Sequence, residues 1–440
     1  MITTTIVALT LGLTPGAAGV GDPYFPQAGN GGFDVAHYDI DLTYARAGIT
    51  ATTTVTARAT QGLSRFDLDF VGLKITSLKV DGTAAKYTRS GQELTVIPAV
   101  GIPAGRTFTV TVAYRGAPNP LADPLLGRSG WLPSPDGVVT LSEPAGSASW
   151  FPVSDHPSDK ATFAYRIRVP RGLSVLANGE RDGDRWVVRE PMAPYLAFIA
   201  IGKWDVREGR TPGGIPSVVA IDPALHESTD TLFERVGTTT DWGVKVFGPY
   251  PFGSTGAVVD DLVTGYALET QNRPFLSSNQ NDLATIVHEL AHQWFGDSVS
   301  VARWQDIWLN EGFASYAEWL FDEQHDGPSA QSRFDRLYAQ GQDWPGWKVT
   351  TGDPGRDRLF SGPGIYQRGA MAVHAVRTAI GDRAFFRLLP AWTAKYRHGN
   401  ATVQDFQALA EQISGTDLDT VFREWLFTAS KPRVVKPATV

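Results

Sequence analysis

Two histidines four positions apart, followed by a distant glutamate, constrain this chain more than any other feature. Residues His288–His292 read His-Glu-Leu-Ala-His, and Glu311 follows after a further eighteen residues. Positions four apart lie on one face of a helix, so both imidazoles can reach a single cation. Two histidines and a glutamate are a known catalytic zinc set that leaves one position for water. The fold must therefore bring the segment carrying Glu311 against the histidine helix.

The glutamate between the histidines has a different predicted role. Glu289 directly follows His288, about 100° around the helix, so its carboxylate should approach the activated water without binding the metal. Zinc acidifies a bound water and polarises a carbonyl oxygen, and a neighbouring carboxylate can accept the water's proton. We therefore expect one zinc ion held by His288, His292 and Glu311, with Glu289 as general base.

Two further features of this region bear on the site. Glu318 lies seven residues after Glu311, on the same helical face, and we expect it to accept the second N–H of a ligating histidine. The alternative is a solvated glutamate, because more acidic residues follow it. Apolar residues form a separate stripe on the histidine helix, which we expect to be buried: Leu283, Val287, Leu290 and Trp294.

Composition limits the classes of protein that remain. With 440 residues, 42% hydrophobic and 19% charged, the chain is long enough for two or three folded domains. A net charge of −7 gives no basic field, so nucleic acid is not an expected partner. No run of eighteen apolar residues occurs, which predicts no membrane span. There is no cysteine, so disulfides and thiolate ligands are excluded. The sequence leaves the oligomeric state unknown.

The N-terminal segment 1–21 has two interpretations. Ile2–Leu13 is apolar and Thr-rich, and Pro15–Ala18 resembles a small-residue cleavage site, as in a secretory signal. A basic segment before the apolar run is missing, since the first arginine is Arg46. The alternative is an ordinary disordered N-terminus. We expect a secreted or extracytoplasmic protein, or a cytoplasmic one if the segment is not a signal.

The periodicity of apolar residues changes near the middle of the chain. Up to about residue 202 apolar residues alternate, as in Tyr38–Tyr44, Phe108–Tyr114 and Phe163–Val169, which predicts an antiparallel β-rich domain at 22–208. Gly209–Pro216 is an interdomain connection or a hairpin turn. A mainly helical domain with a short β segment at 257–270 is predicted over 209–432, with a tail at 433–440. The expected helices are 225–246, 282–296, 305–322, 368–380, 383–396, 403–414 and 417–427. The fold class is therefore α+β.

Several motifs in order resemble one enzyme family. His288–Asp297 and Trp308–Ala314 look like the zinc-binding segments of the aminopeptidase N family of zinc metallopeptidases, close to secreted actinobacterial members. Trp150–Pro157 resembles the family's Phe-Pro turn, with Val153 in place of cysteine. The likeness runs from about Asp34 to Lys431.

Two more of these motifs imply roles for single residues. Tyr266–Thr270 resembles the Gly-Ala-Met-Glu-Asn exopeptidase motif, which implies that Glu269 binds the substrate's free α-amine and that the strand through Ala267 lies alongside the substrate. Tyr366–Ala370 matches Tyr-x-Lys-Gly-Ala, with Arg368 in place of lysine. The resemblance assigns Tyr366 to the developing oxyanion.

The resemblance also implies a second amine-binding residue nine positions before the Phe-Pro proline, which is Glu143 here. Leu141 stands where the family usually has glutamine. Thr270 and Tyr266 also depart from the exopeptidase motif, which puts the substrate preference in doubt. Glu143, Ala267 and Glu269 are thus the implied substrate-binding residues.

The resemblance implies a thermolysin-like second domain and a zinc aminopeptidase acting on peptides with a free N-terminus. Larger relatives carry a further β domain and a C-terminal helical domain, and because this sequence stops at Val440 we expect neither. Three alternatives remain: a thermolysin-like endopeptidase, an epoxide hydrolase as in one branch of the superfamily, and an inactive zinc-stabilised binding module.

Overall fold

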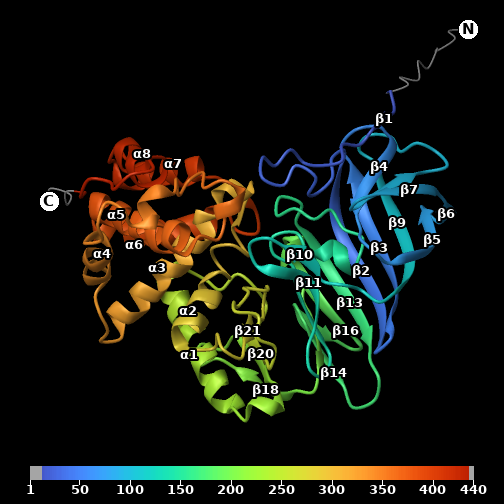
Figure 1. Cartoon of the computed structure of the whole chain (residues 1–440), viewed down its shortest axis with the longest axis horizontal. Coiled ribbons are helices and arrows are strands. Elements are labelled where there is room, and N and C mark those ends of the chain that lie inside the picture. Colours follow the sequence, from blue (N-terminus) through green and yellow to red (C-terminus); the bar gives the residue numbers. More distant parts are fainter. Residues whose placement is uncertain (1–11, 436–440) are drawn as a thin grey trace, which may run out of the picture.

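The computed structural model describes residues 12–435 and divides the chain into two halves of different architecture (Figure 1). The first half is built of β-sheets, and the second is mainly helical around one small sheet. The α+β, two-domain prediction is therefore confirmed.

The largest sheet explains the period of two in the sequence. Its strands lie in the order β15 (Glu180–Asp182), β16 (Arg185–Met192), β13 (Ala161–Arg168), β2 (Phe33–Ala45), β3 (Gly48–Ala59), β9 (Thr107–Gly116), β5 (Lys74–Val80) and β6 (Thr83–Ala84). In β2 the side chains of Tyr38, Ile40 and Leu42 are buried, while the residues between them are partly exposed, as expected when one face packs on a core. Most pairs are antiparallel, but β2 and β13 are parallel, because the long segment between them permits a crossover.

Two smaller sheets complete the N-terminal domain. One contains β1 (Thr14–Pro15), β4 (Leu63–Asp69), β8 (Glu93–Ile97) and β7 (Lys86–Ser90). The other contains β10 (Leu121–Asp123), β11 (Gly127–Pro133), β12 (Val138–Leu141), β17 (Ile199–Gly202) and β14 (Ser174–Ala177). In Figure 1, β10 and β11 lie between the large sheet and the helices. Leu126, in the turn between these two strands, lines the cleft described below.

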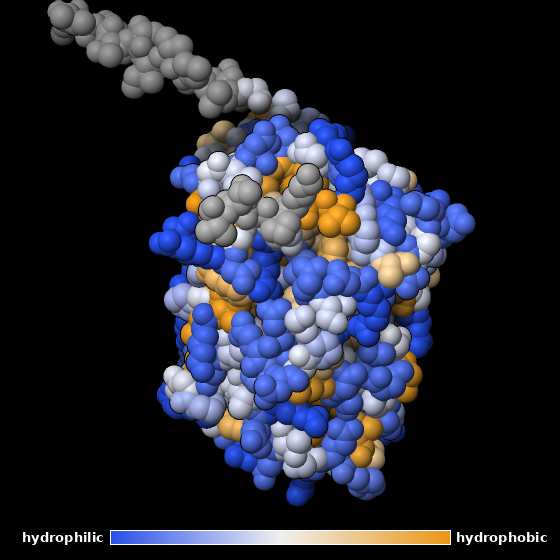
Figure 2. All heavy atoms as spheres, turned by 90° about the vertical axis from the view of Figure 1, so that its left-hand side faces the viewer, coloured by the Kyte–Doolittle hydropathy of each residue, from blue (hydrophilic) through white to orange (hydrophobic). Residues whose placement is uncertain are grey.

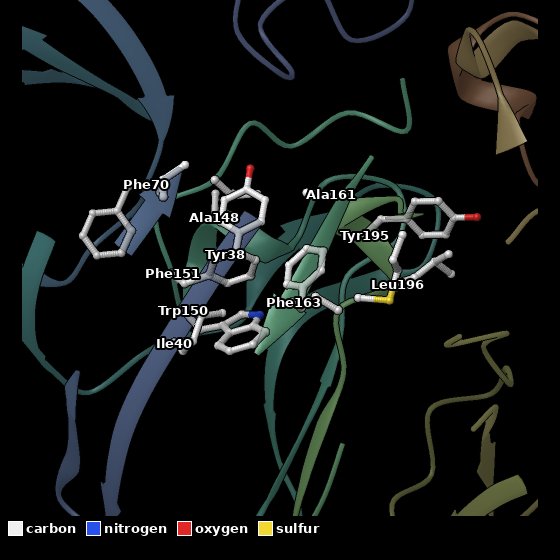
Figure 3. Close-up of a cluster of buried hydrophobic side chains, with 14 of the residues drawn as sticks. Tyr38, Ile40, Phe70, Ala148, Trp150, Phe151, Ala161, Phe163, Tyr195 and Leu196 are labelled. Carbon is white, nitrogen blue, oxygen red and sulfur yellow. The ribbon is translucent and has the colours of Figure 1, made fainter. Parts of the chain in front are cut away.

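Aromatic side chains fill the core of the N-terminal domain (Figure 3). The ring of Tyr38 lies 5.6 Å from that of Phe151 and 4.8 Å from that of Phe163, measured between centroids. Trp150 is also fully buried. Large aromatic side chains contribute much of the burial energy of a core. The Trp150–Pro157 motif is therefore a packing element that anchors the loop after β12, in which Glu143 lies.

Two acidic residues face each other in the four-stranded sheet. Asp69 on β4 is the cross-strand partner of Glu93 on β8, and both are buried. Burial, together with repulsion from Asp69 and Asp67, raises the pKa of Glu93 to about 8. The folded protein keeps this proton between the ordinary glutamate pKa and about pH 8, whereas the unfolded chain releases it. The stabilising contribution is thus present at low pH and is lost as pH rises through this window.

We expect Glu93→Gln to raise the melting temperature at pH 8 by about 5 °C or more and to change it little at pH 5. A raised pKa of this size corresponds to about 2 to 4 kcal/mol at pH 8, and about 1 kcal/mol moves the midpoint of a domain this large by about 2–4 °C. Circular dichroism melts from pH 5 to pH 8 measure the effect. Exposed Glu234→Gln is the control, and equal pH dependence of the wild type and Glu93→Gln would contradict the assignment.

The second domain begins with a four-stranded sheet in the order β18 (Asp205–Arg210), β19 (Pro216–Ile221), β20 (Thr255–Asp260) and β21 (Phe275–Ser277). β18 and β19 are antiparallel, and Thr211 N donates to Ile215 O at 2.8 Å. Gly209–Pro216 therefore contains a hairpin turn. The predicted boundary between residues 208 and 209 falls inside β18, which pairs with β19 along its whole length.

The helices of the second domain follow the sequence prediction, except that α4 is additional and α2 is shorter. Their bounds are α1 (Thr229–Phe247), α2 (Leu283–Ala291), α3 (Trp308–Gln324), α4 (Ala330–Tyr338), α5 (Arg368–Ile380), α6 (Asp382–Lys395), α7 (Val403–Ser414) and α8 (Asp419–Leu426). A two-stranded sheet of β22 (Ser300–Val301) and β23 (Asn400–Ala401) links the regions before α3 and α7. Helix α4 was not predicted, because it is short and follows Pro328. The β segment expected at 257–270 is strand only to Asp260, with an isolated bridge at Leu268.

Helix α2 is shorter than predicted, and its apolar stripe is only partly buried. It ends at Ala291, so buried Trp294 lies beyond its end. Val287 and Leu290 are buried as expected, but Leu283 is 40% exposed. The expectation for Leu283 was wrong because the first turn of α2 forms the rim of a cleft, which Asp282 and Thr285 line.

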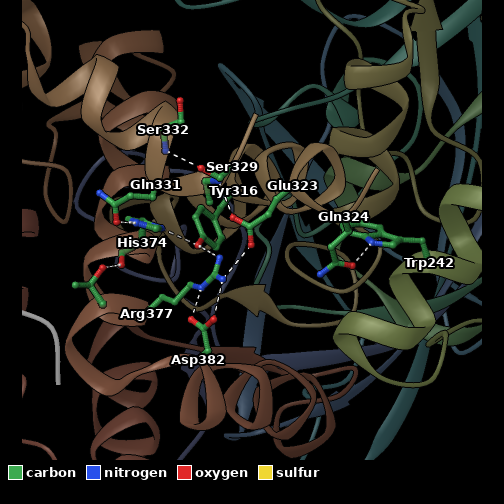
Figure 4. Close-up of polar contacts among 12 residues, drawn as sticks. Trp242, Tyr316, Glu323, Gln324, Ser329, Gln331, Ser332, His374, Arg377 and Asp382 are labelled. Atoms are coloured by element: carbon green, nitrogen blue, oxygen red, sulfur yellow. Dashed lines mark hydrogen bonds and ion pairs between the residues drawn. The ribbon is translucent and has the colours of Figure 1, made fainter. Parts of the chain in front are cut away.

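A polar network fixes α3 against its neighbours (Figure 4). Arg377 on α5 donates to Tyr316 Oη at 3.2 Å and to Glu323 at 3.0 Å, both on α3, and to Asp382 at the start of α6 at 2.8 Å. The Tyr316 hydroxyl also lies 3.0 Å from His374 Nδ1. Charged hydrogen bonds of this kind are the stronger ones. This network fixes α3, which carries the third predicted metal ligand, through side chains that do not line the cleft.

The N-terminal segment is described only from residue 12. Most of the segment 1–21, predicted to be a signal peptide or a disordered N-terminus, lies outside the described residues. Within the described part, Thr14–Pro15 forms β1, which pairs with β4. Within residues 12–435, no helix combines the length and apolarity needed to cross a membrane. The visible surface in Figure 2 is largely hydrophilic with small separate hydrophobic patches, which is normal for a folded protein.

Candidate metal centre and active site

Helices α2 and α3 bring the three predicted ligands together. The side chain of Asp282 caps α2 by accepting from Thr285 N at 2.8 Å, which satisfies a backbone donor of the first turn. Glu311 Oε2 lies 3.3 Å from His288 Nε2 and 3.5 Å from His292 Nε2. All three residues are buried. His288 in α2, His292 as the residue that caps the C-terminal end of α2, and Glu311 in α3 thus converge as the sequence predicts.

This donor set fits a zinc ion. Donors about 2.0–2.1 Å from a tetrahedral metal lie about 3.3 Å from one another, which agrees with both glutamate–histidine distances. Although burial raises its pKa, the imidazoles of His292 and His288 lower the pKa of Glu311 to about 2, so this carboxylate is ionised as a ligand must be. The ligand set is two imidazole nitrogens and one carboxylate oxygen, typical of catalytic zinc sites.

Each histidine is oriented through its other ring nitrogen. Glu318 Oε1 lies 2.7 Å from His288 Nδ1, in the geometry that the sequence predicts. The backbone oxygen of Phe295 lies 2.9 Å from His292 Nδ1. Partners of this kind fix the tautomer that presents Nε2 to a metal.

Glu289 lies beside the ligands without joining them. Its carboxylate falls within 4.8 Å of donor atoms of Glu269 and His292, but not in the set formed by His288, His292 and Glu311. Burial raises the pKa of Glu289 to about 8, against the opposing effect of His288 and His292. A divalent cation at the three ligands would favour the ionised carboxylate. This placement suits a proton acceptor next to the metal.

The two predicted amine-binding residues are buried carboxylates in the same cleft. Glu269 Oε1 accepts a hydrogen bond from Tyr195 Oη at 3.0 Å, and Gln293 Nε2 donates to the backbone oxygen of Glu269 at 3.1 Å. Glu143 Oε1 is buried and has no hydrogen-bond partner among the described residues. Burial and the charge of Glu269 raise the pKa of Glu143 well above its ordinary value. Two such carboxylates favour a cationic group between them.

All the predicted site residues line one cleft of about 440 Å³. The residues it shares with the sequence prediction are Glu143, Ala267, Glu269, His288, Glu289, His292, Glu311, Glu318 and Tyr366. The cleft therefore brings residues from both domains to the metal centre.

Tyr366 reaches the site from a π-helical turn before α5, Gly362–Gln367. Its ring stacks on the His288 ring at 5.8 Å between centroids and 18° between planes. Burial and the nearby carboxylates, Glu311 first, raise the pKa of Tyr366 well above its ordinary value. The phenol thus keeps its proton and can donate a hydrogen bond beside the metal.

The departures from the family motifs have structural explanations. Thr270 is fully buried and donates to Arg273 O at 2.5 Å, so it serves the backbone of the turn. Tyr266 lines the cleft and donates to Arg128 O at 3.2 Å. Arg368 is fully buried. Its hydrogen bonds go to backbone oxygens, including Trp425 O and Val349 O, and its guanidinium lies 5.8 Å from the centroid of the Trp347 ring. Arg368 is therefore a structural residue behind Tyr366.

Sequence reasoning missed three groups that support the site: the Phe295 carbonyl, the Tyr195 hydroxyl and Lys160. Lys160, from the N-terminal domain, donates to the backbone oxygens of Asp297 and Ser298 at 2.8 and 2.9 Å. It thereby holds the turn that follows α2. The Phe295 carbonyl lies only three residues from His292, so a turn after the histidine motif could have suggested it. Tyr195 and Lys160 act through residues 74 and 137 positions away, which no local pattern marks.

Comparison with known proteins identifies the family of both halves. Residues 35–186 match the Peptidase M1 N-terminal domain, and residues 266–425 match the Peptidase family M1 domain. Aminopeptidase N of Streptomyces lividans is 26% identical over 90% of this chain, and glutamyl aminopeptidase of Mus musculus is 27% identical over 68%. The chain spans 50% of the first relative and 35% of the second, half or less of their lengths.

Solved structures agree over almost the whole chain. An M1 zinc metallopeptidase from Deinococcus radiodurans is 28% identical, with a TM-score of 0.86 over 96% of this chain and 100% of that one. A mutant M1 zinc metallopeptidase from the same organism, bound to a Tyr-Ser-Ala substrate, is 28% identical with a TM-score of 0.84 over 96% and 100%. With both domains matched and the zinc-binding geometry in place, the chain belongs to peptidase family M1.

Proposed function

We propose that this protein is a zinc-dependent aminopeptidase that removes the N-terminal residue from peptides. The observation that carries the proposal is the pair of buried carboxylates, Glu143 and Glu269, in the cleft that holds the metal ligands. An exopeptidase must recognise an ammonium group at a fixed distance from the scissile carbonyl, and buried carboxylates do so by charge-assisted hydrogen bonds. An endopeptidase has no such need.

The chain's residues can divide the reaction among them. Zinc, when bound, supplies Lewis acidity that acidifies water and polarises the scissile carbonyl. Glu289 takes a proton from the attacking water as its oxygen approaches the carbonyl carbon. Tyr366 donates a hydrogen bond to the carbonyl oxygen as negative charge develops on it. Glu143 and Glu269 hold the ammonium group, which fixes the first peptide bond over the base.

The relatives support a peptide substrate. The curated matches are named as aminopeptidases, and one solved relative holds Tyr-Ser-Ala as its substrate. A thermolysin-like endopeptidase remains the alternative outcome of the test below.

Acetylation of the substrate's N-terminus is expected to lower kcat/KM at least tenfold to a hundredfold. Each charge-assisted hydrogen bond to the ammonium group is worth about 1.5 to 3 kcal/mol, and acetylation leaves the two carboxylates unpaired. Rates on matched free and acetylated peptides, followed by mass spectrometry, measure the ratio. Glu269→Gln should reduce that ratio at least tenfold, because the amide has no negative charge.

Exposed Glu234→Gln is the matched control and should keep the wild-type ratio. Cleavage of internal bonds in acetylated peptides as fast as that of free N-termini would establish the endopeptidase alternative instead.

We also propose that the protein is exported, because Ile2–Leu13 and Pro15–Ala18 resemble a secretory signal. N-terminal sequencing of protein recovered from the culture medium tests this, and recovery only inside the cells would contradict it.

A further inference from the structure

A second cavity of about 270 Å³ adjoins the active-site cleft. It shares Glu318 and Tyr366 with that cleft and is lined by neither Glu143 nor Glu269. Its other walls come from α3, α4 and the residue after Tyr366: Ser315, Trp319, Arg333, Arg336, Leu337 and Gln367. The cavity therefore lies across Tyr366 and Glu318 from the amine-binding carboxylates.

The order of the amine-binding carboxylates, the metal ligands and Tyr366 along the cleft determines which part of a bound peptide reaches this cavity. With the ammonium group at Glu143 and Glu269 and the scissile carbonyl beside Tyr366, the remaining residues must leave the metal on the far side. An extended chain advances about 3.3–3.6 Å per residue, so a few residues after the scissile bond suffice to pass Tyr366 and enter the cavity. This is the part that departs as the shortened peptide.

The cavity carries positive charge that the described residues do not fully balance. Arg333 forms an ion pair with Asp322 on α3. Arg336, in the last turn of α4, has no acidic partner within ion-pair distance among residues 12–435. Glu318, the acidic residue among those that line the cavity, is engaged with His288. A guanidinium group matches the geometry of a carboxylate with two parallel hydrogen bonds.

We propose that Arg336 binds the free α-carboxylate of short peptide substrates and that the enzyme therefore prefers peptides of a few residues with an unblocked C-terminus. This rests on the proposed aminopeptidase function, because the amine-binding end defines the direction of the substrate. Arg333 lies in the same wall and adds to the local positive charge, while Trp319 and Leu337 supply apolar surface for side chains of the departing peptide.

The test compares alanine peptides of two to six residues, each with a free and an amidated C-terminus. For wild type we expect kcat/KM about fivefold to tenfold higher for the free carboxylate at the length that reaches the cavity, and this preference should weaken as salt is raised. Arg336→Gln should remove the preference, and Arg336→Lys should retain part of it. Because the preference is the ratio of kcat/KM for the free peptide to kcat/KM for the amidated peptide, a loss of activity that affects both substrates equally does not change it.

Arg383→Gln is the matched control, because Arg383 is also an exposed helical arginine but lines neither the cleft nor this cavity. It should keep the wild-type preference. Equal rates on free and amidated peptides, or a preference that survives Arg336→Gln, would overturn the carboxylate site. Alanyl-coumarylamide has no C-terminal carboxylate, so its hydrolysis tests the aminopeptidase function independently of the carboxylate site. If the enzyme hydrolysed neither this substrate nor any of the peptides, the aminopeptidase proposal would be refuted.

Discussion

Replacing Glu289 with glutamine is expected to lower kcat by about 10²- to 10⁴-fold while leaving one zinc ion per chain. The amide keeps the shape of the side chain but cannot accept the proton of the attacking water. Glu289 lies close to the ligands without belonging to the set of His288, His292 and Glu311, so the metal should remain. Single-turnover rates and metal analysis on the same preparation give the two measurements.

His292→Ala is the contrasting variant, because it removes a ligand nitrogen that lies 3.5 Å from Glu311 Oε2. It should lose both zinc and activity. Near-normal turnover by Glu289→Gln would show that another group is the base, and stoichiometric zinc in His292→Ala would refute the ligand assignment.

Tyr366→Phe is expected to lower kcat by about 10²- to 10³-fold with a much smaller change in KM. A hydrogen bond to a developing oxyanion acts mainly in the transition state. The ring stacks on His288, and phenylalanine keeps that contact, so the substitution removes little besides the hydroxyl. Steady-state kinetics on a free tripeptide measure both constants.

Tyr87→Phe, at a position that is 41% exposed in the N-terminal domain, is the matched control and should match the wild type. A change confined to KM in Tyr366→Phe would move Tyr366 from transition-state stabilisation to ground-state binding.

Much of the fold was predictable because its elements have strong local periods. The alternation in β2 and the spacing of helices such as α5 and α7 gave their positions to within a few residues. The prediction errors concern the ends of helices and the short elements, such as α4. Helix α2 ends at Ala291 because the chain turns there, with Asp297 N donating to His292 O at 2.9 Å, and no hydrophobic period reports such a turn.

The prediction of the metal ligands needs no information beyond the spacing of residues along the chain. His288 and His292 share a face through helix geometry alone, and Glu318 shares a face with Glu311 for the same reason, so one packing contact between α2 and α3 completes the site. The family motifs added Glu143, Glu269 and Tyr366, whose roles depend on distances that spacing does not contain.

The residues that surround this site come from distant parts of the chain, and their positions follow from the packing of the elements. Tyr195 reaches Glu269 across 74 positions of sequence, and Lys160 reaches Asp297 across 137. The cavity with Arg336 exists because α4 packs beside α3 and Tyr366. Such contacts form where the side chains of two elements are buried against each other. The local periodicity of a sequence does not show which other element supplies the partner.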